Sequence, residues 1–377
     1  MLPGRCNPFI MSTGKLICTI NRIIYGLIPK RKKHILLLKN DALGDWIIFL
    51  PYFAALRAHF PSSGYTITVI AAQHFHPVIR MTGYADQIWD LIHYKGKIHF
   101  LFTRIRLWLF HYFDMIIVGS PIPEDYTYPY GKNCIATLRD QRYPFQYDVE
   151  KFYKHVIYSN KTSIHERYLQ LIRAAGVSEE IQPFHIPEGK KTSFGIPSSG
   201  YCVICTGASH SGRCWEEEKF STLANKLHEY GITYIVLVSG PEEFERAERI
   251  RKKCKNPEMI TNLCGKTSFL QLFDVIRHAG FMVSNETGPA HVAAAFGVKT
   301  FIICGGGDYG SFVPYRPEME GKTVFSIFRK DQHCFRCGWQ NPQCRNEKIF
   351  PCISDISVEQ VFTKICEGLN ITEKSSK

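Results

Sequence analysis

The sequence lacks several features that would place it in the simpler classes of protein. It has no apolar run suited to crossing a membrane, because the best candidate, residues 11–28, is interrupted by Asn21 and Arg22. Gly, Pro and Ser never form a low-complexity tract, and no internal repeat is found. No small-residue cleavage site follows an early apolar stretch, which disfavours a secretory signal peptide. These absences leave a globular protein, and 377 residues suit two domains of about 150 to 190 residues each.

Positive charge dominates, with a formal net charge of +12. The motif KRKK at residues 30–33 follows the amphipathic segment 11–28, a pattern typical of a helix on a membrane surface. The same segment fits a helix that lies on the body of the protein, and both interpretations stay open. Net charge alone would also permit a nucleic-acid partner. Because no basic and aromatic recognition motif is present, we expect no nucleic acid.

Cysteine is abundant, with fourteen residues, but its distribution is not that of a secreted disulfide protein. Most cysteines lie singly inside apolar strands, as in YCVICT and FIICGG, where a thiol packs as a small hydrophobic group. This pattern predicts a cytoplasmic protein. A cluster at residues 334–352 differs, since a CxxC pair is followed by two more cysteines: Cys334, Cys337, Cys344 and Cys352. The cluster fits a structural zinc site, a disulfide staple or unlinked thiols.

Apolar strands alternate with amphipathic helices along the chain. In the first half we expect strands at residues 34–39, 66–71, 87–92 and 113–118, and a helix at 44–60. Residues 120–144, rich in Tyr and Pro, are expected to be less regular, and two amphipathic stretches follow between 147 and 175. In the second half we expect strands at 201–206, 233–239, 280–283 and 299–304, and helices at 217–230, 242–253, 268–278 and 290–296.

This alternation predicts an α/β protein with two doubly wound, Rossmann-like domains of parallel strands that face a central cleft. The segment PEGKKTSFGIPSSG, residues 187–200, is the best linker. We therefore expect a basic N-terminal segment at 1–33, a first domain at 34–186 and a second domain at 201–377, which includes the cysteine cluster.

Ligands of doubly wound sheets bind beyond the carboxyl ends of the strands, and four stretches at such positions carry polar residues. The first, KNDALGDW, places Gly44 and Asp45 at the start of a helix. Asp45 fits an N-cap, which is the commoner role of aspartate there. It also fits a general base, because a carboxylate can take the proton of an attacking hydroxyl.

Two further stretches offer groups for a nucleotide. CTGASHSGRCW combines small residues, which let the backbone approach a ligand, with an arginine that can bind phosphate: Thr206, Gly207, Ser209 and Arg213. It is either a simple loop or a diphosphate cradle. In SGPEEF, Glu242 can accept hydrogen bonds from a ribose or can complement the helix dipole.

The fourth stretch, SNETGPAH at residues 284–291, joins a strand to a helix. Its first helical turn is built from Thr287, Gly288 and Pro289, and helix N-termini attract anions. Glu286 precedes this turn, and His291 lies about one turn into the helix and faces the same end. The stretch is either an ordinary capped turn or part of a site for a negatively charged ligand.

Taken in order, these stretches resemble glycosyltransferase family 9, the family of the bacterial lipopolysaccharide heptosyltransferases, over residues 34–365. The strongest parts are ILLLKNDALGDWIIFLPYFAALRAHFP and VSNETGPAHVAAAFGVKTFIICGGGD. The resemblance implies a GT-B fold, with the acceptor bound mainly by the first domain and the donor by the second. It also implies a set of site residues: catalytic Asp45, donor-phosphate contacts at Thr206, Ser209, Thr287 and Gly288, and a nucleotide contact at Glu242.

The reaction implied by the resemblance is an inverting transfer from a nucleotide-diphosphate sugar, such as ADP-heptose, to a lipid-linked glycan of the lipopolysaccharide core. Helix N-termini and Arg213 would stabilise the leaving diphosphate, so no catalytic metal is expected. Such an enzyme is expected to be peripheral at the inner face of the cytoplasmic membrane. Arg213 and Glu286 depart from the family's common lysine and aspartate at these positions.

Two other functions are weighed against this one. A catalytically silent nucleotide-sugar-binding relative is the main alternative, prompted by Glu286, and the retention of Asp45 weighs against it. A dinucleotide oxidoreductase is disfavoured, because the GxGxxG fingerprint is missing after the first strand.

Overall fold

The computed structural model of the protein divides into two compact units, Met1–Phe184 and His185–Lys377. The residues that the structure describes are 16, 19, 20, 23, 24, 27, 32–90, 112–120, 133–138, 153, 155–158, 163–182, 186, 194–307, 309–329, 335–339, 341, 344 and 347–371. The division falls just before the linker expected at residues 187–200.

The first unit is built on a six-stranded sheet in which all strands are parallel. The strand order is β3-β2-β1-β4-β5-β6. The strands are β1 Lys33–Leu38, β2 Tyr65–Ala71, β3 Gln87–Asp90, β4 Met115–Val118, β5 Asn133–Leu138 and β6 His155–Tyr158. The described helices are α2 Leu43–His59, the short η1 Gln73–Phe75, α3 His76–Thr82 and α6 Ile164–Ala174.

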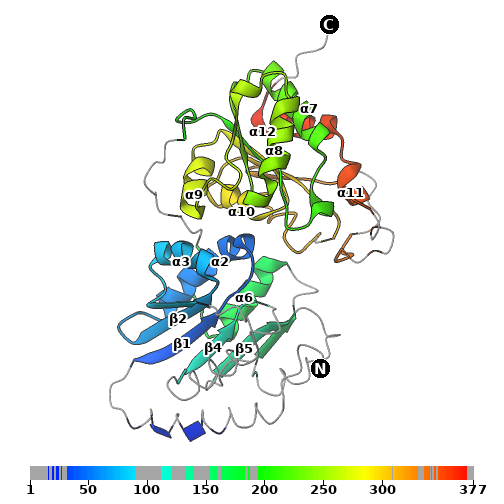
Figure 1. Ribbon diagram of the computed structural model, residues 1–377. Coiled ribbons are helices and arrows are strands. Elements are labelled where there is room, and N and C mark those ends of the chain that lie inside the picture. The colour runs from blue at the N-terminus through cyan, green and yellow to red at the C-terminus, as the bar shows by residue number, and fades with distance from the viewer. Residues whose placement is uncertain are drawn as a thin grey trace, which may run out of the picture. The chain divides into compact units, whose positions relative to one another are not determined.

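The second unit repeats this plan, with strand order β12-β11-β10-β7-β8-β9 (Figure 1). Its strands are β7 Cys202–Cys205, β8 Ile235–Val238, β9 Ile260–Asn262, β10 Phe281–Asn285, β11 Thr300–Ile303 and β12 Val324–Ile327. Its helices are η3 Ser211–Arg213, α7 Glu217–Glu229, η4 Pro241–Glu243, α8 Phe244–Lys253, η5 Pro257–Met259, α9 Phe269–Arg277, α10 Gly288–Ala295, α11 Pro351–Ser354 and α12 Val358–Leu369.

Each sheet reverses its winding direction at one place, and this defines where a ligand is expected. The reversal lies between β1 and β4 in the first unit and between β7 and β10 in the second. Loops that leave the two adjacent strands diverge there, so the crevice beyond the strand ends is open to a ligand. The loops after β1, β7 and β10 carry most of the residues singled out in the sequence.

Both faces of the second sheet are covered, which explains why its strands are almost uninterrupted apolar runs. Cys202 and Phe301 pack in one core cluster with residues of α7, α8 and α12, whereas Ile302 and Cys304 pack in another with residues of α10. Adjacent residues of a strand point to opposite faces, so this two-residue alternation separates the two helical layers. Figure 1 shows α7, α8 and α12 grouped together, apart from α9 and α10.

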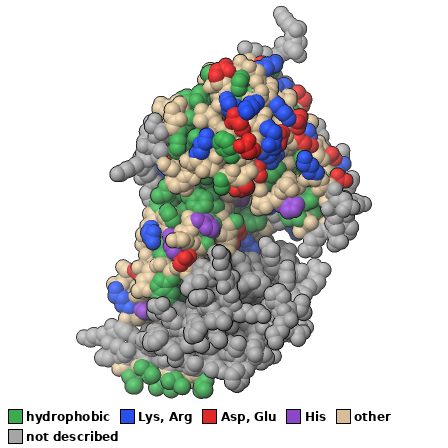
Figure 2. All heavy atoms as spheres, in the orientation of Figure 1, with side chains coloured by type: hydrophobic (Ala, Val, Ile, Leu, Met, Phe, Trp, Pro, Cys, Tyr) green, Lys and Arg blue, Asp and Glu red, His purple; other side chains and the backbone are tan. Residues whose placement is uncertain are grey.

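Acidic and basic side chains are mixed on the outer face of α7 and α8 (Figure 2). Arg249 Nη2 lies 2.7 Å from Glu217 Oε1, and Lys253 forms an ion pair with Glu218. Positive charge on this face is therefore balanced by acidic neighbours.

The structure corrects one expectation about the first unit. Residues 120–144 were expected to be less regular, yet β5 lies inside this stretch and extends the sheet beyond β4. The run NCIATL is short and is flanked by Tyr and Pro residues, so the sequence did not identify it as a strand. It is a strand because it pairs with β4. Among the described residues, none of the helices has both the length and the apolar character needed to cross a bilayer.

Candidate active site

Asp45 lies in the first turn of α2, directly after β1. The N-cap of this helix is Ala42, which makes no side-chain capping bond, so Asp45 occupies the third helical position. The capping role considered from the sequence is therefore wrong, although a carboxylate in the first turn still interacts favourably with the helix dipole. Asp45 is half-buried, while Gly44 before it is buried.

A buried cation lies beside this helix start. The ammonium of Lys39 is fully buried and donates hydrogen bonds of 2.9 Å to both carboxylate oxygens of Asp41 and of 2.8 Å to the Tyr168 hydroxyl. Tyr168, on α6, donates in turn to the backbone oxygen of Asp45 at 3.3 Å and reaches its Oδ1 at 3.5 Å. Sequence reasoning missed Lys39, Asp41 and Tyr168, although the spacing KxDxxGD was a visible signal.

Burial changes the pKa values of Asp41 and Lys39. It raises the pKa of Asp41 to about 6, while the neighbouring Lys39 ammonium pulls that pKa down. It also lowers the pKa of Lys39, against the opposing effect of the Asp41 and Asp45 carboxylates. Each charge is thus costly to bury and is partly compensated by its partner.

In the second unit, the loop after β7 is held close to the loop after β8. Thr206 is buried, and its backbone oxygen accepts hydrogen bonds from Arg246 Nη1 at 3.0 Å and Asn285 Nδ2 at 2.8 Å. A Cβ on Gly207 would lie 2.1 Å from Ser239 Oγ, so a larger residue there would require the side chains of Ser239 and Glu243 to move. Gly207 thus has a packing role, and donor contacts by Thr206 and Gly207 stay a prediction.

The loops after β7 and β10 meet through an ion pair at the reversal point of the sheet. Arg213 Nη2 donates to the backbone oxygen of Glu286 at 3.0 Å and also to its carboxylate. Arg213 Nη1 donates to Ser209 Oγ at 3.2 Å, and the guanidinium lies 4.8 Å from the ring centre of Trp339. The cation expected to bind phosphate therefore already has a carboxylate as counter-ion.

The start of α10 completes this group. Thr287 is the N-cap, in extended conformation without a side-chain capping bond, and Gly288 and Pro289 open the helix. His291 is 3% exposed, its Nδ1 is hydrogen-bonded to the Tyr315 hydroxyl, and its Nε2 lies 3.9 Å from Glu286 Oε1. The structure thus brings together Ser209, Arg213, Glu286 and His291 around the first turn of a helix.

Glu242 and its neighbour have different surroundings. Glu242 is exposed in η4, and its carboxylate covers Gly240 so closely that a Cβ there would lie 2.1 Å from Oε1. Glu243 pairs instead with Arg246, with 3.3 Å between Oε2 and Nη1, and Arg246 also binds Thr206. Glu243 therefore holds the two loops together, and the ribose contact predicted for Glu242 stays a prediction.

The cysteine cluster is only partly described. Cys334 lies outside the described residues, Cys337 and Cys344 are half-buried, and Cys352 is buried in the core. No group of three or more His, Cys, Asp or Glu side chains placed to hold a metal ion occurs within the described part of the chain. Zinc binding by the whole cluster stays a prediction.

Trp339, from the same cysteine-containing segment, packs against Arg213. Trp339 stacks on Phe350 at 5.3 Å between ring centres, and its ring covers Gly305 and Gly307 after β11. A Cβ on Gly307 would lie 2.1 Å from this ring. Trp339 was missed in the sequence, because nothing in the local pattern places it beside the loops after β7 and β11.

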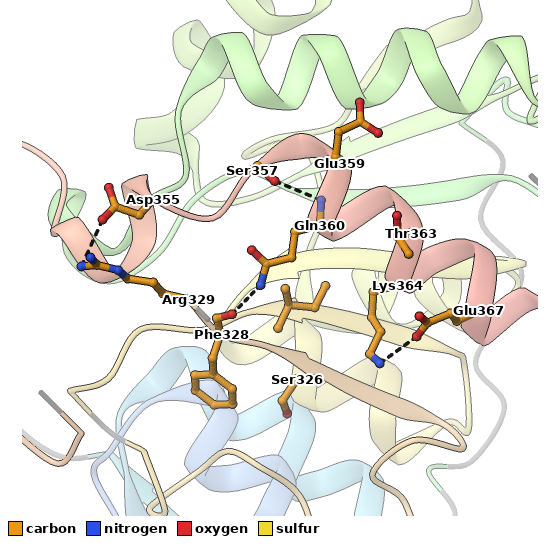
Figure 3. A pocket seen from close by; sticks show the side chains of 11 residues that line it. Ser326, Phe328, Arg329, Asp355, Ser357, Glu359, Gln360, Thr363, Lys364 and Glu367 are labelled. Carbon is orange, nitrogen blue, oxygen red and sulfur yellow. Dashed lines mark hydrogen bonds and ion pairs between the residues drawn. The ribbon is translucent and has the colours of Figure 1, made fainter. Parts of the chain in front are cut away.

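A cavity of about 840 Å³ lies elsewhere, beside the edge strand β12 and helix α12 (Figure 3). Its polar side chains already bond to the protein itself: Gln360 donates to the Phe328 oxygen at 2.5 Å, and Lys364 Nζ lies 2.8 Å from Glu367 Oε2. Its lining includes none of the residues predicted from the sequence to bind a ligand.

Comparison with known proteins connects these features to one family. The family model described as glycosyltransferase family 9 (heptosyltransferase) matches residues 142–343, more than half of the chain. A curated relative, lipopolysaccharide heptosyltransferase 3 of Escherichia coli, is 23% identical over 298 residues, which cover 73% of this chain and 84% of the relative.

Two solved structures share the fold. A glycosyltransferase of family 9 from Veillonella parvula superposes with a TM-score of 0.71 and 16% identity, covering 90% of this chain and 98% of the other. The ADP-heptose lipopolysaccharide heptosyltransferase II of E. coli superposes with a TM-score of 0.64 and 17% identity, covering 89% and 99%. The chain therefore belongs to glycosyltransferase family 9 and is a glycosyltransferase of the GT-B fold.

Proposed function

We propose that this glycosyltransferase moves heptose from ADP-heptose to an acceptor of the lipopolysaccharide core or a related surface glycan. The observation that carries the proposal is the Asp45 carboxylate, half-buried in the first turn of α2 after β1. The printed names of the relatives, a lipopolysaccharide heptosyltransferase and an ADP-heptose heptosyltransferase, support the choice of donor and acceptor.

In the proposed reaction, an acceptor hydroxyl attacks the anomeric carbon of the donor sugar. The new carbon–oxygen bond forms as the bond to the diphosphate breaks, and attack from the opposite face inverts the anomeric centre. Asp45 accepts the hydroxyl proton as the general base, a role worth roughly two to four orders of magnitude in rate. ADP then leaves with the electron pair of the broken bond.

The leaving diphosphate needs stabilisation of its negative charge, which the second unit can supply. At the start of α10, Pro289 has no N–H and the Ala290 N–H donates to the Thr287 oxygen at 3.0 Å, so the Gly288 N–H and the helix dipole are what favour an anion there. Arg213 adds a positive charge, provided that its interaction with Glu286 is shared or replaced by a phosphate oxygen. These groups act without a metal, so we propose a reaction that does not require one.

We also propose that the N-terminal segment holds the protein at the cytoplasmic face of the inner membrane. Its described apolar side chains are highly exposed: Leu16 63%, Ile20 48%, Ile23 63%, Ile24 52% and Leu27 78%. Spacings of three and four residues place such side chains on one face of a helix. Hydrophobic side chains form a group at the lower edge of Figure 2, where Figure 1 draws short dark-blue pieces of ribbon from the described residues before β1. The following KRKK motif would be attracted to anionic lipids.

The decisive experiment is a transfer assay with a panel of nucleotide sugars. ADP-heptose, UDP-glucose and GDP-mannose are each incubated with heptose-deficient lipopolysaccharide, and the glycan product is detected by mass spectrometry. We expect transfer from ADP-heptose alone, unaffected by EDTA. Transfer from another nucleotide sugar would reject the donor assignment. Binding of ADP-heptose without transfer to any core acceptor would favour a silent relative instead.

A further inference from the structure

We propose that Lys39, Asp41 and Tyr168 form a positioning relay, a chain of hydrogen bonds that orients the Asp45 carboxylate. The inference rests on the proposed role of Asp45 as general base and identifies the residues that prepare it for that role. It is carried by four consecutive contacts, from Asp41 to Lys39, from Lys39 to Tyr168, and from Tyr168 to two oxygens of Asp45.

The first link is a lysine in an unusual place. Lys39 follows β1, is 0% exposed, and its ammonium lies over the rings of Trp46, Phe49 and Tyr168 at 5.5, 4.9 and 4.5 Å from their centres. Removing an ammonium from water costs several kcal/mol, and a buried ion pair rarely repays this in stability. An apolar residue would pack better at this position, so the retained charge fits a role in geometry rather than in stability.

Asp41 compensates that charge and restricts its position. Both of its carboxylate oxygens accept from Lys39 Nζ at 2.9 Å, and its side chain is only 11% exposed. Asn40, between the two, donates its backbone N–H to Ser120 Oγ at 2.5 Å, which ties the loop after β1 to the end of β4. The pair is thereby anchored on the rigid reversal point of the first sheet.

Tyr168 connects the Lys39 ammonium to Asp45 through hydrogen bonds. Its oxygen accepts from Lys39 Nζ at 2.8 Å, so the hydroxyl proton is directed away from the ammonium. The donor contacts of that hydroxyl are the Asp45 backbone oxygen at 3.3 Å and Asp45 Oδ1 at 3.5 Å. Contacts of this length are weak in the unliganded site and commonly tighten when substrate binds.

The charged and titratable groups around Asp45 come from two sides. Lys39 and Asp41 lie on the β1 side, and Arg167 and Tyr168 lie on α6, with the Arg167 guanidinium 5.5 Å from the centre of the Tyr168 ring. Among these groups, the Tyr168 hydroxyl reaches the Asp45 carboxylate, at 3.5 Å from Oδ1. Loss of this hydroxyl should therefore change the hydrogen bonding of the carboxylate even though the other charges remain.

A direct test needs no substrate. The full chain is labelled with ¹³C at aspartate carboxyl groups, the Asp45 signal is assigned from Asp45→Asn, and its chemical shift is compared between variants at one pH by NMR. We expect Tyr168→Phe to move this signal, because the chemical shift of a carboxyl carbon depends on the hydrogen bonds that the carboxylate accepts. The matched control is Tyr52→Phe, which removes a buried hydroxyl that bonds His165 Nδ1 at 3.3 Å in the same aromatic cluster. It should leave the Asp45 signal in place.

Two outcomes would overturn the relay: an unmoved Asp45 signal in Tyr168→Phe, or an equal movement of that signal in both tyrosine variants. Lys39→Arg tests the relay at its other end, since it keeps the charge but replaces the ammonium with a planar guanidinium. It too should move the Asp45 signal. If Tyr168→Phe does not fold, this variant decides the question alone.

Kinetics separate failure of the relay from failure of the proposed function. With ADP-heptose and heptose-deficient lipopolysaccharide, Tyr168→Phe should lower kcat roughly 3- to 10-fold and leave the donor KM unchanged. An inactive Asp45→Asn with an unaltered kcat in Tyr168→Phe would reject the relay but keep the base. A fully active Asp45→Asn would reject the base itself, while the NMR result would still stand.

Discussion

Arg213 donates to both the backbone oxygen and the carboxylate of Glu286, and so joins the loops that follow β7 and β10. The resemblance drawn from the sequence implies a lysine and an aspartate at these two positions, and the structure shows that both departures concern one interaction. Glu286 is 7% exposed and also lies near His291. The positive charge at the start of α10 is therefore balanced before any donor phosphate arrives.

This pairing predicts that neutralising Glu286 strengthens nucleotide binding. In Glu286→Gln the side chain keeps its shape, but Arg213 loses its counter-ion and a bound phosphate loses a repulsive neighbour. We expect ADP to bind roughly 3- to 10-fold more tightly by isothermal titration calorimetry, and Arg213→Ala to bind it at least as much more weakly. Arg249→Ala, which breaks an exposed pair with Glu217, is the control and should not change ADP affinity. Weaker ADP binding in Glu286→Gln would make Glu286 a ligand rather than a counter-ion.

Much of the fold could be predicted from the sequence because its strands are apolar runs in parallel sheets. The last four residues of KHILLL and all residues of CVIC and TFII are buried, and α2 and α10 begin within a few residues of the strands that precede them. Strands β5, β6, β9 and β12 escaped prediction, because short strands become recognisable only through the neighbours that pair with them.

The site was predicted less completely, for a geometric reason. Asp45 and the residues of the loops after β7 and β10 stand in local motifs, whereas Tyr168 is 129 positions from the lysine it binds. Trp339 likewise reaches Arg213 from a distant segment. A local sequence pattern shows which polar residues follow a strand. It does not show which residue from a distant part of the chain contacts them, and this becomes visible only in the folded structure.

The raised pKa of Asp41 predicts a specific dependence of stability on pH. Its folded-state pKa of about 6 lies above the ordinary value of about 3.9, so the folded protein binds this proton more tightly than the unfolded chain does. The stability from this group is complete below about pH 4 and is lost as pH rises through about 6. Asp41→Asn, which cannot ionise, should therefore gain in melting temperature relative to wild type between pH 4 and 6. A difference that stays constant across this range would contradict the shift.

Membrane attachment is predicted to depend on the exposed apolar side chains near the N-terminus. Ile20→Asp combined with Ile23→Asp places charge on that face and should reduce binding to vesicles of phosphatidylethanolamine and phosphatidylglycerol by at least roughly tenfold. Wild-type binding should weaken as salt rises, because the KRKK motif contributes through screened charge. Leu270→Asp, at an exposed apolar residue of α9, is the control and should bind as wild type does. Equal binding by all three proteins in a flotation assay would remove the proposal.

The cysteine cluster makes a prediction about metal content. If the four cysteines hold zinc, the purified protein carries about one equivalent, and Cys337→Ser lowers both the zinc content and the melting temperature. Cys254→Ser is the matched control: burial raises the pKa of that thiol to about 11, and its replacement should affect stability alone. Metal-free protein with the melting temperature of wild type would leave the cluster as packing residues. Activity should survive EDTA under conditions that leave the fold intact.

The catalytic role of Asp45 is tested by Asp45→Asn, which keeps the shape of the side chain and removes the base. Turnover should fall by roughly two to four orders of magnitude, the usual contribution of a general base. ADP affinity should barely change, because the residues proposed to hold the diphosphate belong to the second unit. The charge lost from the first turn of α2 should lower stability only by about 0.3 to 1 kcal/mol, since Ala42 rather than Asp45 is the N-cap.

Asp86→Asn provides the comparison for this last variant. Asp86 pairs with Arg57 and accepts from the Ile67 backbone N–H, so its loss affects the stability of the same unit without touching Asp45. We expect Asp86→Asn to melt at a lower temperature yet turn over normally, and Asp45→Asn to show the reverse. Rate and melting temperature measured on one preparation of each variant separate the two roles. Normal turnover by Asp45→Asn would show that this carboxylate serves the helix and not the reaction.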